Sequence, residues 1–157
     1  MRFWKFTILL FMALSTNAFS KGGEFTIEDK DLSRVSEKIH SAVSKDASFS
    51  PFKSLDCKLT GKEIPLTSPT ISTYFVTTSN ACGWGAAVGP IWIVDASYGK
   101  VILSTGGYAV EVHRRTKNGF RDIDVNSEIS GELKSVPYSF KGGKYMPSKV
   151  RGKATHY

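Results

Sequence analysis

Two cysteines and three histidines are the side chains best suited to nucleophilic or metal chemistry in this chain of 157 residues. A cysteine hydrolase would use Cys82 as its nucleophile and His113 as the base that activates it. An even cysteine count behind an export signal instead favours one disulfide between Cys57 and Cys82. That bond would close a loop of about 25 residues and contribute roughly 3 kcal/mol to stability. Two unpaired thiols are the remaining alternative.

No other set of residues forms a recognisable catalytic or metal motif. The histidines are His40, His113 and His156. They lie far apart in sequence and have no companion at metal-ligand spacing. Asp122 and Asp124 form a D-x-D pair, but a calcium site needs more oxygen ligands in a glycine-containing loop. We expect both carboxylates on the solvent face of a strand, near Arg114 or Arg121. The sequence therefore predicts no catalytic residue, no metal and no cofactor.

Trp84 is the strongest candidate for a binding residue. It lies between Gly83 and Gly85 in a loop of small residues, so no neighbour in sequence covers its ring. Exposed loop tryptophans often anchor a partner because they bury a large area on binding. The alternative is a tryptophan that folds back over the sheet edge, where a disulfide at Cys82 would hold its loop. Trp92, between two isoleucines, is expected in the core.

Basic side chains gather around an Asn-Gly pair at residues 118–119. The candidate binding residues there are His113, Arg114, Arg115 and Arg121. The chain has 21 lysines and arginines against 14 acidic residues, which gives a formal net charge of +7. This balance favours an anionic envelope component or an acidic protein as partner. Export argues against nucleic acid, and an ordinary solvated basic surface is the alternative.

The first 20 residues have the order of a secretory signal peptide. Arg2 and Lys5 precede an apolar run at residues 8–14, and small polar residues follow it. Cleavage is expected after Ser20, or else after Ala18, and would lower the net charge from +7 to +5. The apolar run is far shorter than a bilayer span, and no later segment is long enough to cross a membrane. The mature protein should be periplasmic or secreted.

The mature chain is expected to form one α+β domain over residues 21–146. Apolar residues spaced by three and four predict an amphipathic helix within residues 26–45, and the residues concerned are Leu32, Val35, Ile39 and Val43. Asp29 or Asp31 is the expected N-cap. The rest alternates as β-structure, with turns at Gly106-Gly107, at Asn118-Gly119 and at Gly142-Gly143. Short connections predict an antiparallel meander of about six or seven strands. Residues 147–157 should be a basic disordered tail.

Five motifs in the later half occur in a set order. They are Tyr-Phe-Val-Thr-Thr at 74–78, Ala-Cys-Gly-Trp-Gly at 81–85, Gly-Pro-Ile-Trp-Ile-Val at 89–94, Gly-Phe-Arg-Asp-Ile at 119–123 and Tyr-Ser-Phe-Lys-Gly-Gly-Lys-Tyr at 138–145. This order resembles small exported bacterial β-rich proteins. Gly-x-x-Asp-Ile also resembles one blade of FG-GAP-type repeats, but the calcium-loop aspartates are missing. The Ser-Gly-x-x-Tyr-type motif of periplasmic lysozyme inhibitors is not reproduced. The resemblance implies a β-rich exported domain and no catalytic residue.

These observations predict an exported, non-enzymatic cell-envelope binding protein. Its sharper form is an inhibitor or immunity-type protein that acts on another protein, because a small stapled β scaffold with a presented loop suits an enzyme cleft. A small cysteine hydrolase using Cys82 and His113 is one alternative. A structural or surface-association protein that uses its basic patch is the other.

Overall fold

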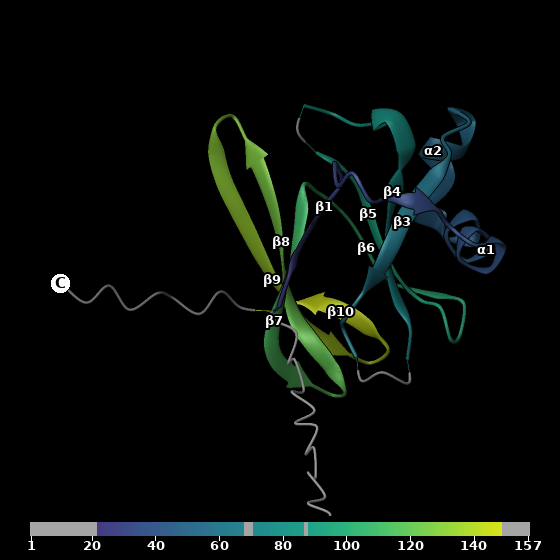
Figure 1. Cartoon of the computed structure of the whole chain (residues 1–157). Helices are drawn as coiled ribbons and strands as arrows, with labels where there is room; N and C mark the ends of the chain where they lie inside the picture. The colour runs from purple at the N-terminus through teal and green to yellow at the C-terminus, as the bar shows by residue number, and fades with distance from the viewer. Residues whose placement is uncertain (1–21, 68–70, 87, 149–157) are drawn as a thin grey trace, which may run out of the picture.

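The computed structural model describes residues 22–67, 71–86 and 88–148. Within them the chain forms two antiparallel five-stranded sheets and a small helical layer (Figure 1). Sheet A has the order β1 (Glu24–Thr26), β7 (Ala109–Lys117), β8 (Phe120–Ile129), β9 (Glu132–Lys141), β10 (Lys144–Pro147). Sheet B has the order β2 (Ser33–Arg34), β3 (Leu59–Ile64), β4 (Thr73–Thr78), β5 (Gly89–Asp95), β6 (Lys100–Gly107). The helices are α1 (Glu37–Lys45) and α2 (Ser50–Ser54), and short 3₁₀ turns are η1 (Ala47–Phe49) and η2 (Ser79–Ala81).

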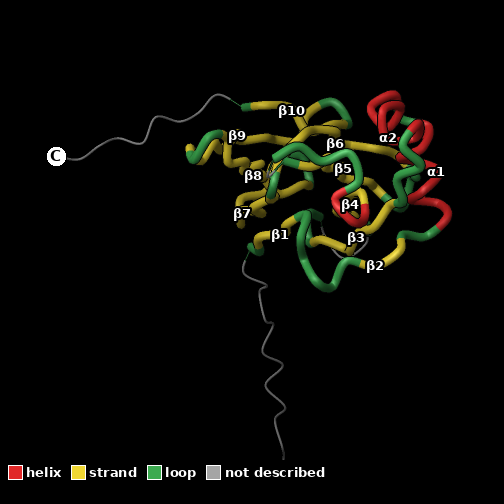
Figure 2. Tube along the Cα trace, turned by 90° about the horizontal axis from the view of Figure 1, so that it is seen from above, coloured by secondary structure: helices red, strands yellow, loops and turns green. Residues whose placement is uncertain are grey.

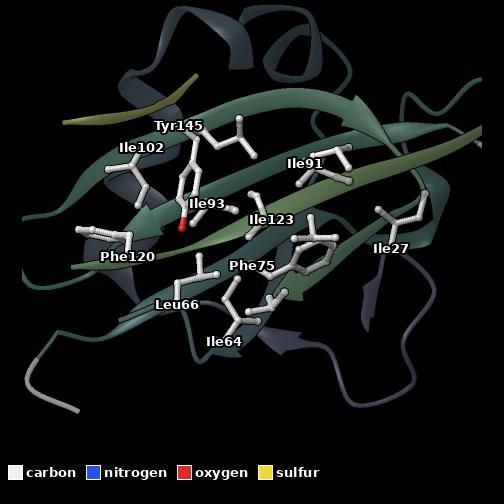
Figure 3. Close-up of a cluster of buried hydrophobic side chains, with 14 residues drawn as sticks. Ile27, Ile64, Leu66, Phe75, Ile91, Ile93, Ile102, Phe120, Ile123 and Tyr145 are labelled. Atoms are coloured by element: carbon white, nitrogen blue, oxygen red, sulfur yellow. The ribbon is translucent and has the colours of Figure 1, made fainter. Parts of the chain in front are cut away.

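The main core fills the space between the two sheets (Figure 3). Ile91 and Ile93 of β5 point into it and meet Ile123 of β8. A second core lies on the opposite face of sheet B, where α1 packs, and includes Trp92 and Val94. Every residue of β5 is therefore buried, as its unbroken apolar run predicts for a strand covered on both faces.

The predicted α+β class, one helix on a single meander, is wrong. The described chain is mostly β, and its strands divide between two sheets. The prediction fails at Gly106-Gly107, where the composition indicates a hairpin turn but both glycines pair with β5 as part of β6. Gly107 still pairs with Gly89 in sheet B, and after Tyr108 the chain enters sheet A as β7. A Cβ atom on Gly107 would lie 2.6 Å from Cγ1 of Val125, so glycine permits the close approach at which the chain changes sheets.

The N-terminal helix is also shorter than predicted. Residues 24–26 and 33–34 are strands, and α1 begins only after Ser36. Asp29 is not an N-cap, because its carboxylate accepts hydrogen bonds from the backbone N–H and hydroxyl of Thr26 in the turn after β1. The predicted apolar stripe is divided accordingly: Ile39 and Val43 lie in the second core, whereas Leu32 packs against the first.

Two of the predicted hairpins form as expected. Asn118-Gly119 joins β7 to β8 with positive φ angles of 53° and 80°, and Gly142-Gly143 joins β9 to β10. Pro147 ends β10 instead of opening a tail. The predicted signal peptide and residues 149–157 lie outside the described residues. No helix among the described residues has the length and apolar character to cross a membrane.

Candidate binding site

The disulfide predicted between Cys57 and Cys82 is present, with Cα atoms 5.5 Å apart. It joins the segment after α2 to the loop between β4 and β5. Cys82 therefore has no free thiolate, and His113 lies on sheet A, where its Nε2 is 3.1 Å from Oδ1 of Asp124. The structure does not bring together the pair on which the cysteine-hydrolase alternative depends. Among the described residues, no three His, Cys, Asp or Glu side chains converge as metal ligands.

Trp84 folds back onto the protein instead of standing free. Its indole N–H donates to Oγ1 of Thr78 at 2.7 Å, and the Thr78 hydroxyl donates to the carbonyl oxygen of Cys82 at 2.7 Å. Gly89 lets the ring approach, because a Cβ atom there would lie 2.9 Å from the indole nitrogen. The half-buried ring also packs against the main core. These contacts match the alternative in which Trp84 covers the sheet edge.

The basic candidates lie apart from the Trp84 loop. Gly89, which follows that loop, pairs with Gly107 at the end of β6, two residues before β7 begins, while His113, Arg114 and Arg115 lie several residues along β7 toward its other end. At about 3.4 Å per residue, the separation is roughly 20 Å. Arg115 Nε is 3.7 Å from a carboxylate oxygen of Asp122, and Arg114 is exposed. The predicted binding set is thus two separate surfaces.

Arg121 is held mainly through its backbone. Its N–H donates to the carbonyl oxygen of Leu66, and its own carbonyl accepts the hydroxyl of Tyr145 at 2.7 Å. Its Nη1 atom and Oδ1 of Asp122 are buried and have no hydrogen-bond partner among the described residues. Gly83 and Gly85 are exposed beside the disulfide, and Gly83 has φ of 71°, which glycine adopts without strain.

An exposed apolar arm was not predicted from the sequence. The β8–β9 hairpin continues past both neighbouring strands, because β7 reaches only Asn126 and β10 reaches only Tyr138 (Figure 1). Residues 127–134, which we call the arm, pair only with one another within the described chain. Large apolar side chains of the arm and its base are exposed: Leu133 at 84%, Ile129 at 47% and Val136 at 41%.

A signal for the arm does exist in the sequence. Ser130-Gly131, with φ angles of 56° and 79°, forms its two-residue turn, and Ile129 and Leu133 flank this turn closely. A small polar residue followed by glycine between apolar residues is typical of such hairpins. Sequence alone could not show that no third strand covers it.

Two cavities lie along β6. One cavity, of about 290 Å³, lies between β6 and β10, and a second, of about 320 Å³, lies toward the Gly83 loop. Ser104, an exposed residue of β6, lines both. The first reaches Tyr138 of β9, two residues from Val136 at the base of the arm. We call these two cavities together the β6 groove.

The fold and site define a disulfide-stapled, two-sheet β protein with an apolar arm and a groove beside it. Comparisons with protein-family models, with curated proteins and with solved structures each find no match. The likeness to small exported β-rich proteins therefore remains one of short motifs, and function has to be argued from the surface itself.

Proposed function

We propose that this chain is an exported, non-enzymatic binding protein that captures another protein of the cell envelope through its arm. Inhibition or neutralisation of that partner is the sharper form of the proposal. The leader-like N-terminus and the disulfide between Cys57 and Cys82 support export, because such bonds persist in oxidising compartments.

The exposed apolar arm is the observation that carries the proposal. A two-stranded hairpin without a third strand is marginally stable in water, and apolar side chains on it gain from burial in a partner. Ile129 pairs with Glu132, so these two residues share a face of the hairpin, and Val136 lies on that face as well. Leu133 follows Glu132 directly and therefore lies on the opposite face. A partner that covers both faces would clasp the arm.

The binding region that we propose differs from the one expected from sequence. Trp84 supports the loop from inside, so we place recognition at Leu133 and the neighbouring arm residues instead. The basic side chains His113, Arg114 and Arg115 remain a separate surface, which would act through long-range attraction of anionic groups. Structural attachment to the envelope through that patch is the second proposal, and it predicts binding that disappears as salt rises.

A capture experiment with a matched control tests the proposal. Protein exported from the full-length chain, with its disulfide intact, would be immobilised and exposed to envelope and culture-supernatant extracts at low and moderate salt. Leu133→Ser removes the most exposed arm residue. Tyr98→Ser is the control, because Tyr98 is 80% exposed but lies in the β5–β6 turn, away from the arm.

The proposal expects one protein that wild type and Tyr98→Ser retain at moderate salt and that Leu133→Ser loses. Equal retention by all three forms would refute the use of the arm. Retention of polyanions alone, lost as salt rises, would refute capture of a protein and favour the basic patch.

A further inference from the structure

We infer that the free edge of the arm pairs with the same edge of a second copy of this chain, so that the two hairpins form one antiparallel sheet centred on Leu133. The occupant of the edge is therefore a second copy. The pairing goes beyond the proposed capture of a protein and does not depend on it, because it uses the edge of the arm, whereas capture uses its two faces.

The outer edge of β9 is unpaired along the arm. β10 pairs with β9 only from Lys141 to Tyr138, and one further bond, from the Ser148 N–H to the Pro137 carbonyl oxygen at 2.8 Å, ends the contact. Among the described residues, no strand pairs with this edge at residues 132–136, and all five of these residues are exposed. In both views the tip of the arm stands clear of sheet B and of β10 (Figures 1 and 2). This edge therefore has room for another strand.

Backbone groups of the arm point out of this edge at alternate residues. Ile129 and Glu132 flank the two-residue turn and bond to each other, and the alternation continues along the hairpin. The N–H and C=O groups of Leu133 and Ser135 consequently face away from β8. The bond that the Pro137 carbonyl accepts on this edge confirms the order, because residue 137 follows in the same alternation. A row of unpaired donors and acceptors of this kind is a template for an added strand.

The bond at Pro137 limits how far two copies can overlap. Residues that face outward must lie opposite one another in an antiparallel pair. If Leu133 of one copy lies opposite Leu133 of the other, the turn residue Gly131 comes to lie opposite Ser135, and the space is free. The next longer overlap would place Gly131 opposite Pro137, where Ser148 is already bonded. Pairing centred on Leu133 is therefore the longest that the edge permits.

The charges of the two edges are complementary in this register. Glu132 of each copy lies opposite Lys134 of the other, at positions without backbone bonds, where side chains approach most closely. Both residues are exposed, and neither forms an ion pair among the described residues. Leu133, which is 84% exposed, lies against Leu133 of the other copy. The next shorter overlap would instead set Glu132 against Glu132, so charge, apolar contact and space favour the same register.

A second copy suits this edge because a two-fold axis presents the same residues to each other. Each Glu132–Lys134 contact therefore occurs twice. Pairing also converts a two-stranded hairpin, which is marginally stable in water, into a sheet with enough strands to be stable. The formal net charge of +7 opposes association at long range, but physiological salt screens that repulsion beyond about 8 Å, whereas the paired side chains are in direct contact.

Charge-reversal variants, measured alone and mixed, test the pairing. The exported full-length chain, with its disulfide intact, would be followed by sedimentation equilibrium in physiological salt from about 10 µM to about 500 µM, because so small an interface should bind weakly. Lys134→Glu and Glu132→Lys each create two like-charge contacts and should each weaken the dimer at least about tenfold. Mixed in equal amounts, these two variants should form a heterodimer within about threefold of the wild-type dissociation constant, because every contact again joins opposite charges. Lys141→Glu, the control on β9 beyond the arm, should leave the dissociation constant within about twofold.

A cysteine cross-link tests the register. Two Leu133→Cys copies would place their Cα atoms about 5.5 Å apart, a separation that suits a disulfide, so mild oxidation should link them. Ser135→Cys is the matched control, because Ser135 is exposed on the same edge but would lie roughly 14 Å from its counterpart. Its cross-linking should be at least about tenfold slower. The disulfide between Cys57 and Cys82 leaves no other free thiol among the described residues.

Several results would overturn the inference. They are a wild type that stays monomeric at about 500 µM, wild-type dissociation constants for both charge reversals, no association of the mixed variants, and equally fast cross-linking of Ser135→Cys. If a monomeric wild type becomes a dimer only after deletion of residues 149–157, the chain's own C-terminal segment is the occupant instead.

The two proposals can fail separately. If charge reversal leaves association unchanged but Leu133→Ser abolishes capture, the pairing is wrong and capture through the arm stands. If the mixed variants associate as expected and Leu133→Ser captures what wild type captures, capture through the arm is wrong and the pairing stands.

Discussion

The two hydrogen bonds that connect Trp84, Thr78 and Cys82 give a direct test of whether Trp84 is structural. Trp84→Phe keeps an aromatic ring in the site but removes the indole donor, which leaves one hydrogen bond fewer at the buried hydroxyl of Thr78. Thr78→Val removes that hydroxyl, and with it the bond to the Cys82 carbonyl. A net hydrogen bond contributes about 0.5–1.5 kcal/mol. We therefore expect losses of about 1–2 kcal/mol for Trp84→Phe and about 2 kcal/mol for Thr78→Val.

The double variant isolates the bond between the two side chains. If that bond is formed, the combined loss should fall short of the sum by about 1 kcal/mol. The assay is urea unfolding followed by far-UV circular dichroism, with the disulfide intact, because fluorescence would change with the tryptophan itself. Losses that add within about 0.3 kcal/mol, together with a negligible loss for Trp84→Phe, would refute the structural role of Trp84.

Three further predictions concern stability. Burial would raise the pKa of Asp29, but hydrogen bonds from Lys62 and Thr26 outweigh it and hold that pKa below its ordinary value. The resulting stability is present above the unfolded-state pKa and lost as pH falls through the folded-state pKa. Asp29→Asn should therefore lower the free energy of urea unfolding by about 1–2 kcal/mol near neutral pH, and the difference from wild type should shrink as pH falls below about 4. Gly61→Ala should cost at least about 2 kcal/mol in the same assay, because its Cβ would run into the carbonyl oxygen of Phe75, whereas Gly85→Ala, whose nearest neighbour is 3.9 Å away, should stay within about 0.5 kcal/mol. Reduction of the Cys57–Cys82 disulfide should cost roughly 3 kcal/mol, seen as a lower urea midpoint, and an unchanged midpoint would contradict this.

Local patterns predicted the strands and turns but not their assembly. The apolar run of β5, the Asn118-Gly119 turn and the Gly142-Gly143 turn each depend on neighbours in sequence, and all three are confirmed. Gly106-Gly107 has the composition of a hairpin turn, yet the chain continues through it from one sheet to the other. Only contacts across the molecule, such as that of Gly107 with Val125, determine that outcome.

The predicted helix is too long for a related reason. A spacing of three and four residues places Leu32 and Val35 on one helical face with Ile39, but the same residues satisfy two different cores in the folded chain. Asp29 has the chemistry of an N-cap, and it is instead held by Lys62 of β3 at 2.7 Å. A partner more than thirty positions away cannot be read from local periodicity.

The candidate site was the least predictable part because it depends on what is missing beside a strand. Leu133 looks like any strand residue in sequence, and its exposure follows from the shorter reach of β7 and β10.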